Sequence, residues 1–186
     1  MGKDVIVACD FASKGALIEF IDKFTGRKPF VKIGMELFYA EGPDIVKAVK
    51  ERGHKIFLDL KLCDIPNTVK KSMKVLSALD VDMTNLHAFG TKEMMKAAIE
   101  GLTREDGTRP ILIAVTQLTS TSEERMKNDL LIEKPLKEVV SHYANNAKIA
   151  AIQVDIACTL YSNLSDLKSG AIAINAIDIG HKKATN

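Results

Sequence analysis

Short runs of hydrophobic residues alternate along the chain with segments whose hydrophobic residues recur at helical spacing. The runs predict strands over 5–11, 29–34, 55–61, 81–88 and 111–118, with fainter candidates over 149–156 and 171–178. Four segments between the first five runs have the spacing of amphipathic helices, over 16–24, 45–53, 69–79 and 94–99. Pro43 and Pro66 stand where a first helical turn tolerates proline, which agrees with these helix positions.

The predicted strands begin about 24 to 30 residues apart, which is the length of one strand-and-helix unit. They are almost continuously hydrophobic, as parallel strands buried on both faces are. Such units build either a (β/α)8 barrel or a doubly wound sheet, and no glycine-rich phosphate loop supports the second. We therefore predict an α/β protein with one domain over 1–186, a (β/α)8 TIM barrel. Its C-terminal βα units are expected to be incomplete or divergent, since no eighth unit is recognisable after 171–178.

Composition and charge narrow the classes of protein that this chain can represent. A hydrophobic content of 46% and a charged content of 27% exclude disorder, and a net charge of +2 argues against a nucleic-acid or membrane-surface protein. The 3 cysteines form no C-x-x-C pair, as expected in a reducing cytosol. The N-terminus does not resemble a signal peptide, and no hydrophobic run reaches the roughly 18 residues of a membrane helix. We therefore expect a cytoplasmic protein without a membrane or nucleic-acid partner.

Charged residues mark the carboxyl ends of the first three predicted strands, where parallel barrels place their chemistry. Asp10 ends the first strand, and Lys32 interrupts the otherwise hydrophobic second strand. The third strand carries Asp59 and Lys61, with Asp64 in the loop just beyond.

The two-residue period of a strand places Phe57, Asp59 and Lys61 on one face and the intervening leucines on the other. The leucines are expected to pack under the helices, so that Asp59 and Lys61 point into the barrel mouth. Buried charges must pair, and Lys32 on the adjacent strand is the natural partner, which predicts an alternating row of Lys32, Asp59, Lys61 and Asp64. A salt-bridge network that only closes the barrel is the structural alternative. Because buried ionic networks stabilise poorly and more often mark sites, we favour an active site.

Other polar residues at strand ends carry weaker signals. His87 either binds substrate or is a core histidine that hydrogen-bonds within the barrel. Thr116 and Thr119 could bind a polar ligand or cap the following helix. Asp155 could join the site at the end of the sixth strand. The histidines lack metal-ligand spacing, so we expect no metal site.

One continuous segment makes the sequence recognisable. Residues 59–68 read D-L-K-L-C-D-I-P-N-T and resemble the D-x-K-x-x-D-I-P-x-T signature of the orotidine 5'-monophosphate decarboxylase family. Residues 8–11, 30–38 and 113–120 also resemble its bacterial form, so that the resemblance covers residues 4–148. Related sugar-phosphate lyases of the same superfamily share only D-x-K-x-x-D and lack the block at 31–38.

This resemblance implies a cofactor-free carboxy-lyase that converts orotidine 5'-monophosphate to UMP in pyrimidine biosynthesis. It implies that Lys61 protonates C6 of the pyrimidine and that Asp59 lies beside the reacting carboxylate. Asp10 and Lys32 are implied at the ribose, and Thr119 at the nucleotide near the pyrimidine. In the family, the residues that match Asp64 and Thr68 complete the site of the neighbouring subunit, which implies a homodimer with shared active sites.

The resemblance fails after about residue 149. The family's T-P-G-I-R, D-Q-x-R and final V-G-R segments are missing, and no arginine follows Arg125. Those segments supply the family's grip on the 5'-phosphate, so the substrate is expected to bind weakly and react slowly. Three explanations remain open: an incomplete copy of a full-length enzyme, a truncated or frameshifted product with impaired activity, or a non-catalytic barrel that dimerises or binds a partner.

Overall fold

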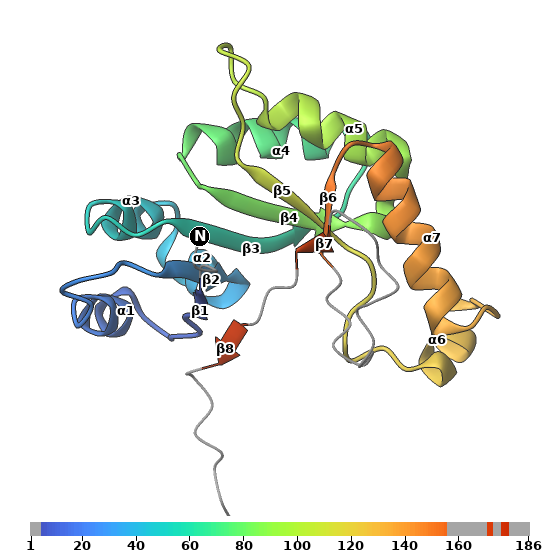
Figure 1. Cartoon of the computed structure of the whole chain (residues 1–186), viewed down its shortest axis with the longest axis horizontal. Coiled ribbons are helices and arrows are strands. Elements are labelled where there is room, and N and C mark those ends of the chain that lie inside the picture. The colour runs from blue at the N-terminus through green and yellow to red at the C-terminus, as the bar shows by residue number, and fades with distance from the viewer. Residues whose placement is uncertain (1–4, 156–170, 173–175, 179–186) are drawn as a thin grey trace, which may run out of the picture.

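In the part of the chain that the structure describes, eight parallel strands form a single curved sheet (Figure 1). The computed structural model describes residues 5–155, 171–172 and 176–178. The strands are β1 (Ile6–Ala8), β2 (Phe30–Gly34), β3 (Ile56–Leu62), β4 (Met83–His87), β5 (Ile111–Val115), β6 (Gln153–Asp155), β7 (Ala171–Ile172) and β8 (Ala176–Asp178). Their order is β7-β6-β5-β4-β3-β2-β1-β8. Neighbours in sequence are therefore neighbours in space, and β8 lies against β1, which is the strand order of a TIM barrel.

The C-terminal part corrects one prediction. Residues 171–178 were expected to form a single seventh strand. Instead, β7 pairs with β6 through Ala171 and Ile172, whereas β8 pairs with β1 through Ala176–Asp178. The sequence pattern could not separate the two strands, because no glycine or proline interrupts residues 171–178.

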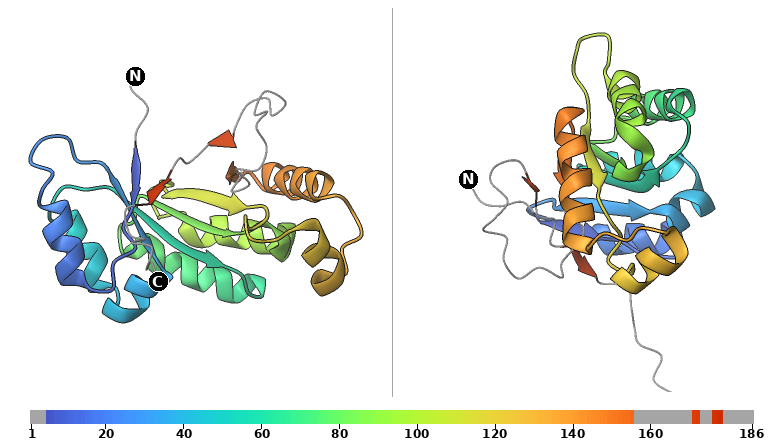
Figure 2. Two further views of the ribbon diagram at one scale, coloured as in Figure 1. Left: turned by 90° about the horizontal axis from the view of Figure 1, so that it is seen from below. Right: turned by 90° about the vertical axis from the view of Figure 1, so that its right-hand side faces the viewer.

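Helices line the outer side of the curved sheet (Figures 1 and 2). They are α1 (Lys14–Ile21), α2 (Met35–Glu41), α3 (Asp44–Lys50), α4 (Pro66–Ala78), α5 (Thr91–Leu102), α6 (Glu123–Leu130) and α7 (Leu136–Ile149). The four predicted helical segments correspond to α1, α3, α4 and α5. The sequence analysis did not predict α2 or α7. Pro43 caps α3 and Pro66 begins α4, as the sequence pattern predicted.

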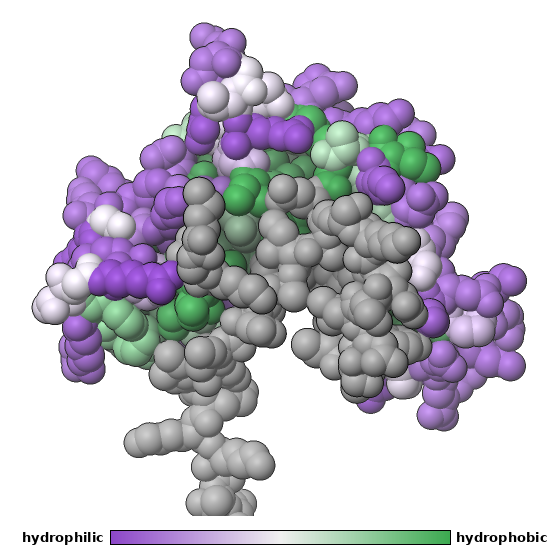
Figure 3. Space-filling view, in the orientation of Figure 1, coloured by the Kyte–Doolittle hydropathy of each residue, from purple (hydrophilic) through white to green (hydrophobic). Residues whose placement is uncertain are grey.

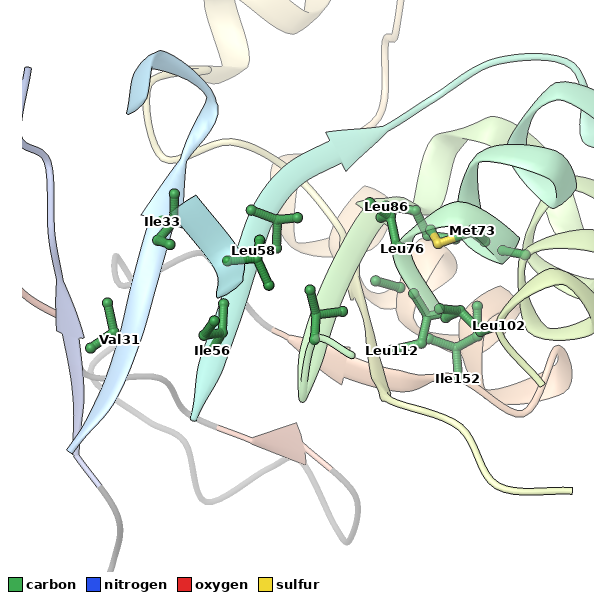
Figure 4. Close-up of a cluster of buried hydrophobic side chains, with 14 of the residues drawn as sticks. Val31, Ile33, Ile56, Leu58, Met73, Leu76, Leu86, Leu102, Leu112 and Ile152 are labelled. Atoms are coloured by element: carbon green, nitrogen blue, oxygen red, sulfur yellow. The ribbon is translucent and has the colours of Figure 1, made fainter. Parts of the chain in front are cut away.

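Two hydrophobic layers flank the sheet and confirm the predicted alternation along β3. Phe57 belongs to an inner cluster with Ile6, Met83 and Ile113, one residue from each of four strands. Leu58 belongs to the large outer core, and Leu60 and Leu62 pack against that core. Figure 4 shows this outer core, with Leu86, Met73 and Leu76 between β4 and α4.

The surface is mostly hydrophilic over the helices. In Figure 3, hydrophobic residues gather toward the middle of the visible face, while hydrophilic residues cover its periphery. Within the described residues, no helix has the length and apolar character needed to cross a membrane.

Candidate active site

Four charged side chains form a continuous row across the carboxyl ends of β1, β2 and β3. Lys32 Nζ lies 3.4 Å from Asp10 Oδ1 and 3.4 Å from Asp59 Oδ2. Lys61 Nζ donates to the other oxygen of Asp59 at 2.5 Å. Parallel register explains the arrangement, because Ala8 pairs with Lys32 and Gly34 pairs with Asp59. The predicted pairing of Lys32 with Asp59 is confirmed, and Asp10 extends the row at the β1 end.

Asp59 is the centre of this row. Its burial would raise the pKa of the carboxyl group, but hydrogen bonds from Lys61 and Asn85 and the charges of Lys61 and Lys32 outweigh burial and hold the pKa below its ordinary value. A lowered carboxyl pKa stabilises the fold above the ordinary pKa of about 3.9, and this stabilisation is lost as pH falls through the folded-state pKa. The row therefore keeps Asp59 ionised at neutral pH.

The backbone of β3 departs from regular strand geometry at Lys61. Leu58 pairs with Thr84 and Leu62 pairs with Leu86, so residues 59–61 face the single residue Asn85 of β4. Lys61 itself has a φ of 49°, in the left-handed region that non-glycine residues rarely occupy. This bulge preserves the parity of the strand, because two extra residues return Leu62 to the leucine face.

Sequence reasoning missed Asn85, which the structure places inside the charged row. Its side chain donates to Asp59 Oδ1 at 2.7 Å and accepts from the backbone N–H of Lys61 at 2.7 Å. Asn85 is only 2% exposed. One signal could have identified it: β4 presents Met83, Asn85 and His87 on one face, and asparagine is depleted in strands.

His87 lies at the end of β4, close enough to Lys61 and Asp59 for their charges to act on its ring. Burial and the positive charge of Lys61 lower the pKa of His87, and Asp59 opposes them. The imidazole ring lies 4.7 Å from the ring of Phe89, centroid to centroid. His87 is therefore a neutral side chain at the edge of the row at pH 7.

Asp64 and Thr68 lie outside the row and on the surface. Asp64 accepts a hydrogen bond from the backbone N–H of Ile65 at 2.7 Å. Asp64 was predicted to join the row beside Lys61, but no ion pair joins these two residues within the described part of the chain, so the row of this chain does not include Asp64. Both side chains line a groove of about 610 Å³ that also contains Lys61 and Cys63. Most of the remaining lining is hydrophobic: Phe38, Tyr39, Pro43, Leu60, Leu62, Val69, Val75, Leu76 and Leu79.

The residues after β5 divide into buried and exposed groups. Thr116 is fully buried, and its hydroxyl has no hydrogen-bond partner among the described residues. Thr119 is exposed in the loop that follows. Asp155 closes β6 opposite Val115, and its side chain lies outside the described residues.

Neither described cysteine is an activated nucleophile. Burial and the charge of Asp10 raise the pKa of Cys9 to about 12, against the opposing charge of Lys32. Burial and Asp64 also raise the pKa of Cys63. Over the described ranges, no group of three or more histidine, cysteine, aspartate or glutamate side chains is placed to hold a metal ion.

Comparison with known proteins agrees with this geometry. The sequence model of the "Orotidine 5'-phosphate decarboxylase / HUMPS family" matches residues 3–173, past residue 148, where the sequence analysis placed the end of the resemblance. Proteins named orotidine 5'-phosphate decarboxylase from Bacillus cytotoxicus and Bacillus mycoides are each 56% identical over 163 residues. These alignments cover 86% of this chain and 68% of each relative.

Solved structures show the same relationship. An uncharacterized conserved protein from Geobacillus kaustophilus has a TM-score of 0.79 and 52% identity, covering 82% of this chain and 73% of its own. Orotidine 5'-phosphate decarboxylase from Lactobacillus acidophilus has a TM-score of 0.77 and 40% identity, covering 83% of this chain and 71% of its own. With a parallel barrel topology, a Lys–Asp–Lys row and these relatives, the chain belongs to the orotidine 5'-phosphate decarboxylase / HUMPS family.

Proposed function

We propose that this protein is a cytoplasmic carboxy-lyase that converts orotidine 5'-monophosphate to UMP in pyrimidine biosynthesis. The observation that carries the proposal is the Lys32–Asp59–Lys61 row at the carboxyl ends of adjacent parallel strands. The names of the relatives support the same reaction. Asp10 and Lys32 are assigned to the ribose hydroxyls, and Thr119 to the nucleotide near the pyrimidine.

The proposed step uses Lys61 as the proton donor. The bond between C6 and the carboxyl carbon breaks, CO₂ leaves, and the electron pair stays on C6. The Lys61 ammonium stabilises this developing negative charge and then donates a proton to C6, after which Lys61 regains a proton from solvent. Asp59 lies beside the substrate carboxylate and holds Lys61 in place through their 2.5 Å hydrogen bond. The proposed step uses no metal or organic cofactor.

A single-turnover assay tests the proposed reaction. Enzyme in excess over orotidine 5'-monophosphate should convert it to UMP. The change in ultraviolet absorbance and chromatography of the product measure this conversion. Excess enzyme makes the assay sensitive even where binding is weak. Unchanged substrate after prolonged incubation with folded protein would refute the assignment.

We also propose a homodimer in which Asp64 and Thr68 complete the neighbouring active site. Both residues are exposed beside the hydrophobic groove, and hydrophobic side chains around them are exposed as well: Tyr39 at 72%, Ile65 at 67% and Val75 at 60%. A second copy of this chain would cover these surfaces and bring a carboxylate toward Lys61 of its partner.

Mixing two inactive variants tests the shared site. Lys61→Ala and Asp64→Ala subunits, combined and allowed to exchange, should recover about a quarter of the parent activity, because half of the dimers then hold one undamaged site. A mixture of Lys61→Ala and Asp59→Ala subunits is the matched control. Lys61 and Asp59 of one site come from the same subunit, so every subunit in this mixture has a damaged row and no site is restored. Absence of recovery from a verified mixed dimer would show that Asp64 does not act across the interface.

A further inference from the structure

The bulge in β3 creates a structural problem at Lys61. Residues 59–61 face a single residue of β4, so the regular ladder cannot supply partners for all of their backbone groups. Lys61 also has a left-handed backbone with a φ of 49°, a conformation that is sterically unfavourable for a residue with a Cβ atom. Such a conformation persists where surrounding contacts hold it in place.

Asn85 supplies those contacts through both ends of its amide. Its oxygen accepts the N–H of Lys61 at 2.7 Å, and its NH₂ group donates to Asp59 Oδ1 at 2.7 Å. The same Asp59 oxygen accepts from Lys61 Nζ at 2.5 Å. Asn85 thus fixes the backbone of one residue of the row and the carboxylate of another, and at 2% exposure it is shielded from competing water.

We infer that Asn85 is a positioning residue that sets the Lys61 ammonium and the Asp59 carboxylate in their reactive arrangement. This inference rests on the proposed decarboxylation, because Lys61 is the proposed donor. It assigns a role to a residue on β4, whereas the charged row itself comes from β1, β2 and β3.

Only a side chain with both a donor and an acceptor at position 85 can hydrogen-bond to the Asp59 carboxylate and to the Lys61 N–H at the same time. Aspartate has nearly the same shape and keeps the acceptor for Lys61 N–H, but it places a second carboxylate against Asp59. Leucine has similar volume and removes both hydrogen bonds, leaving the Lys61 N–H and one Asp59 oxygen with a missing partner.

Two variants, Asn85→Leu and Asn85→Asp, test the inference. Each should lower kcat by about 10- to 100-fold with KM nearly unchanged, because the Lys61 ammonium, the proposed proton donor, is displaced while the proposed ribose contacts remain. Asp59 should also titrate at a higher pH, since it loses a hydrogen-bond donor in the first variant and gains a like charge in the second. The acid limb of the kcat profile should therefore move upward. Besides Asn85, the groups that act on Asp59 are Lys32 from β2 and Lys61 from β3. Asp10 is paired to Lys32, and the ring of His87 from β4 lies within reach of the charge of Asp59.

Thr84→Val is the matched control. Thr84 is a fully buried polar residue on the same strand and donates to the carbonyl of Leu58 at 3.0 Å, on the opposite face of the sheet. Its loss should lower stability while leaving the acid limb in place, as a purely structural effect would.

Carboxyl NMR of Asp59 separates this inference from the proposed function, because it needs no turnover. If the parent protein fails to decarboxylate but the Asp59 titration shifts in the Asn85 variants, the positioning contact stands and the reaction assignment falls. Folded Asn85→Leu or Asn85→Asp protein with parent kcat and an unchanged Asp59 titration would overturn the inference.

Discussion

Replacing Lys61 by alanine is expected to lower the decarboxylation rate by about 10⁴-fold or more. The variant loses the ammonium that stabilises negative charge at C6 and the proton that C6 receives, and no other described group is assigned to donate it. Lys32 remains, but it is already shared between Asp10 and Asp59. The effect should fall on kcat, measured by single-turnover absorbance change at saturating enzyme.

The fold should survive this substitution. The Lys61 side chain is 26% exposed, and its removal leaves Asp59 paired with Lys32 and hydrogen-bonded to Asn85. Lys55→Ala is the matched control, since Lys55 is exposed just before the opposite end of β3. It should react at close to the parent rate. A folded Lys61→Ala protein within about 10-fold of the parent rate would remove Lys61 from the proposed mechanism.

Local alternation was sufficient to predict the face of β3 that carries the chemistry. Phe57 lies in the inner layer and Leu58 in the outer core, so a two-residue period places Asp59 correctly. The partner Lys32 was also predictable, because adjacent parallel strands end at the same edge of the sheet. These features depend on residues close in sequence and on one general rule of barrel topology.

The role of Asn85 could not be predicted in the same way. It depends on the offset between β3 and β4, where three residues face one, and the local sequence pattern of either strand does not reveal this offset. The left-handed backbone of Lys61 could not be predicted from the sequence either, because lysine has no preference for that conformation. Similarly, α2 has only one buried residue, Leu37, so its hydrophobic pattern is too weak to predict a helix.

Close packing of α4 against α5 leads to the largest expected effect on stability. Gly101 is buried in α5, and a Cβ atom there would lie 2.1 Å from the carbonyl oxygen of Lys70 and 3.1 Å from its Cα. Both atoms belong to the backbone of α4, so the clash cannot be relieved by the rotation of a side chain. Alanine inside a helix normally stabilises by up to about 1 kcal/mol relative to glycine. Here we expect Gly101→Ala to lower the free energy of unfolding by about 1–3 kcal/mol instead.

Urea unfolding measures this reversal of sign, with Gly15→Ala as the control. Gly15 lies in α1, and the nearest atom to its Cβ position is Ser13 Oγ at 4.0 Å, so that variant should be at least as stable as the parent. A Gly101→Ala variant that is as stable as the parent would show that α4 and α5 can separate at no cost.

The substitution also connects packing to the proposed site, because Lys70 is two residues from Thr68 on α4. If α4 retreats from α5, Thr68 moves with it, and the surviving folded enzyme should show a raised KM.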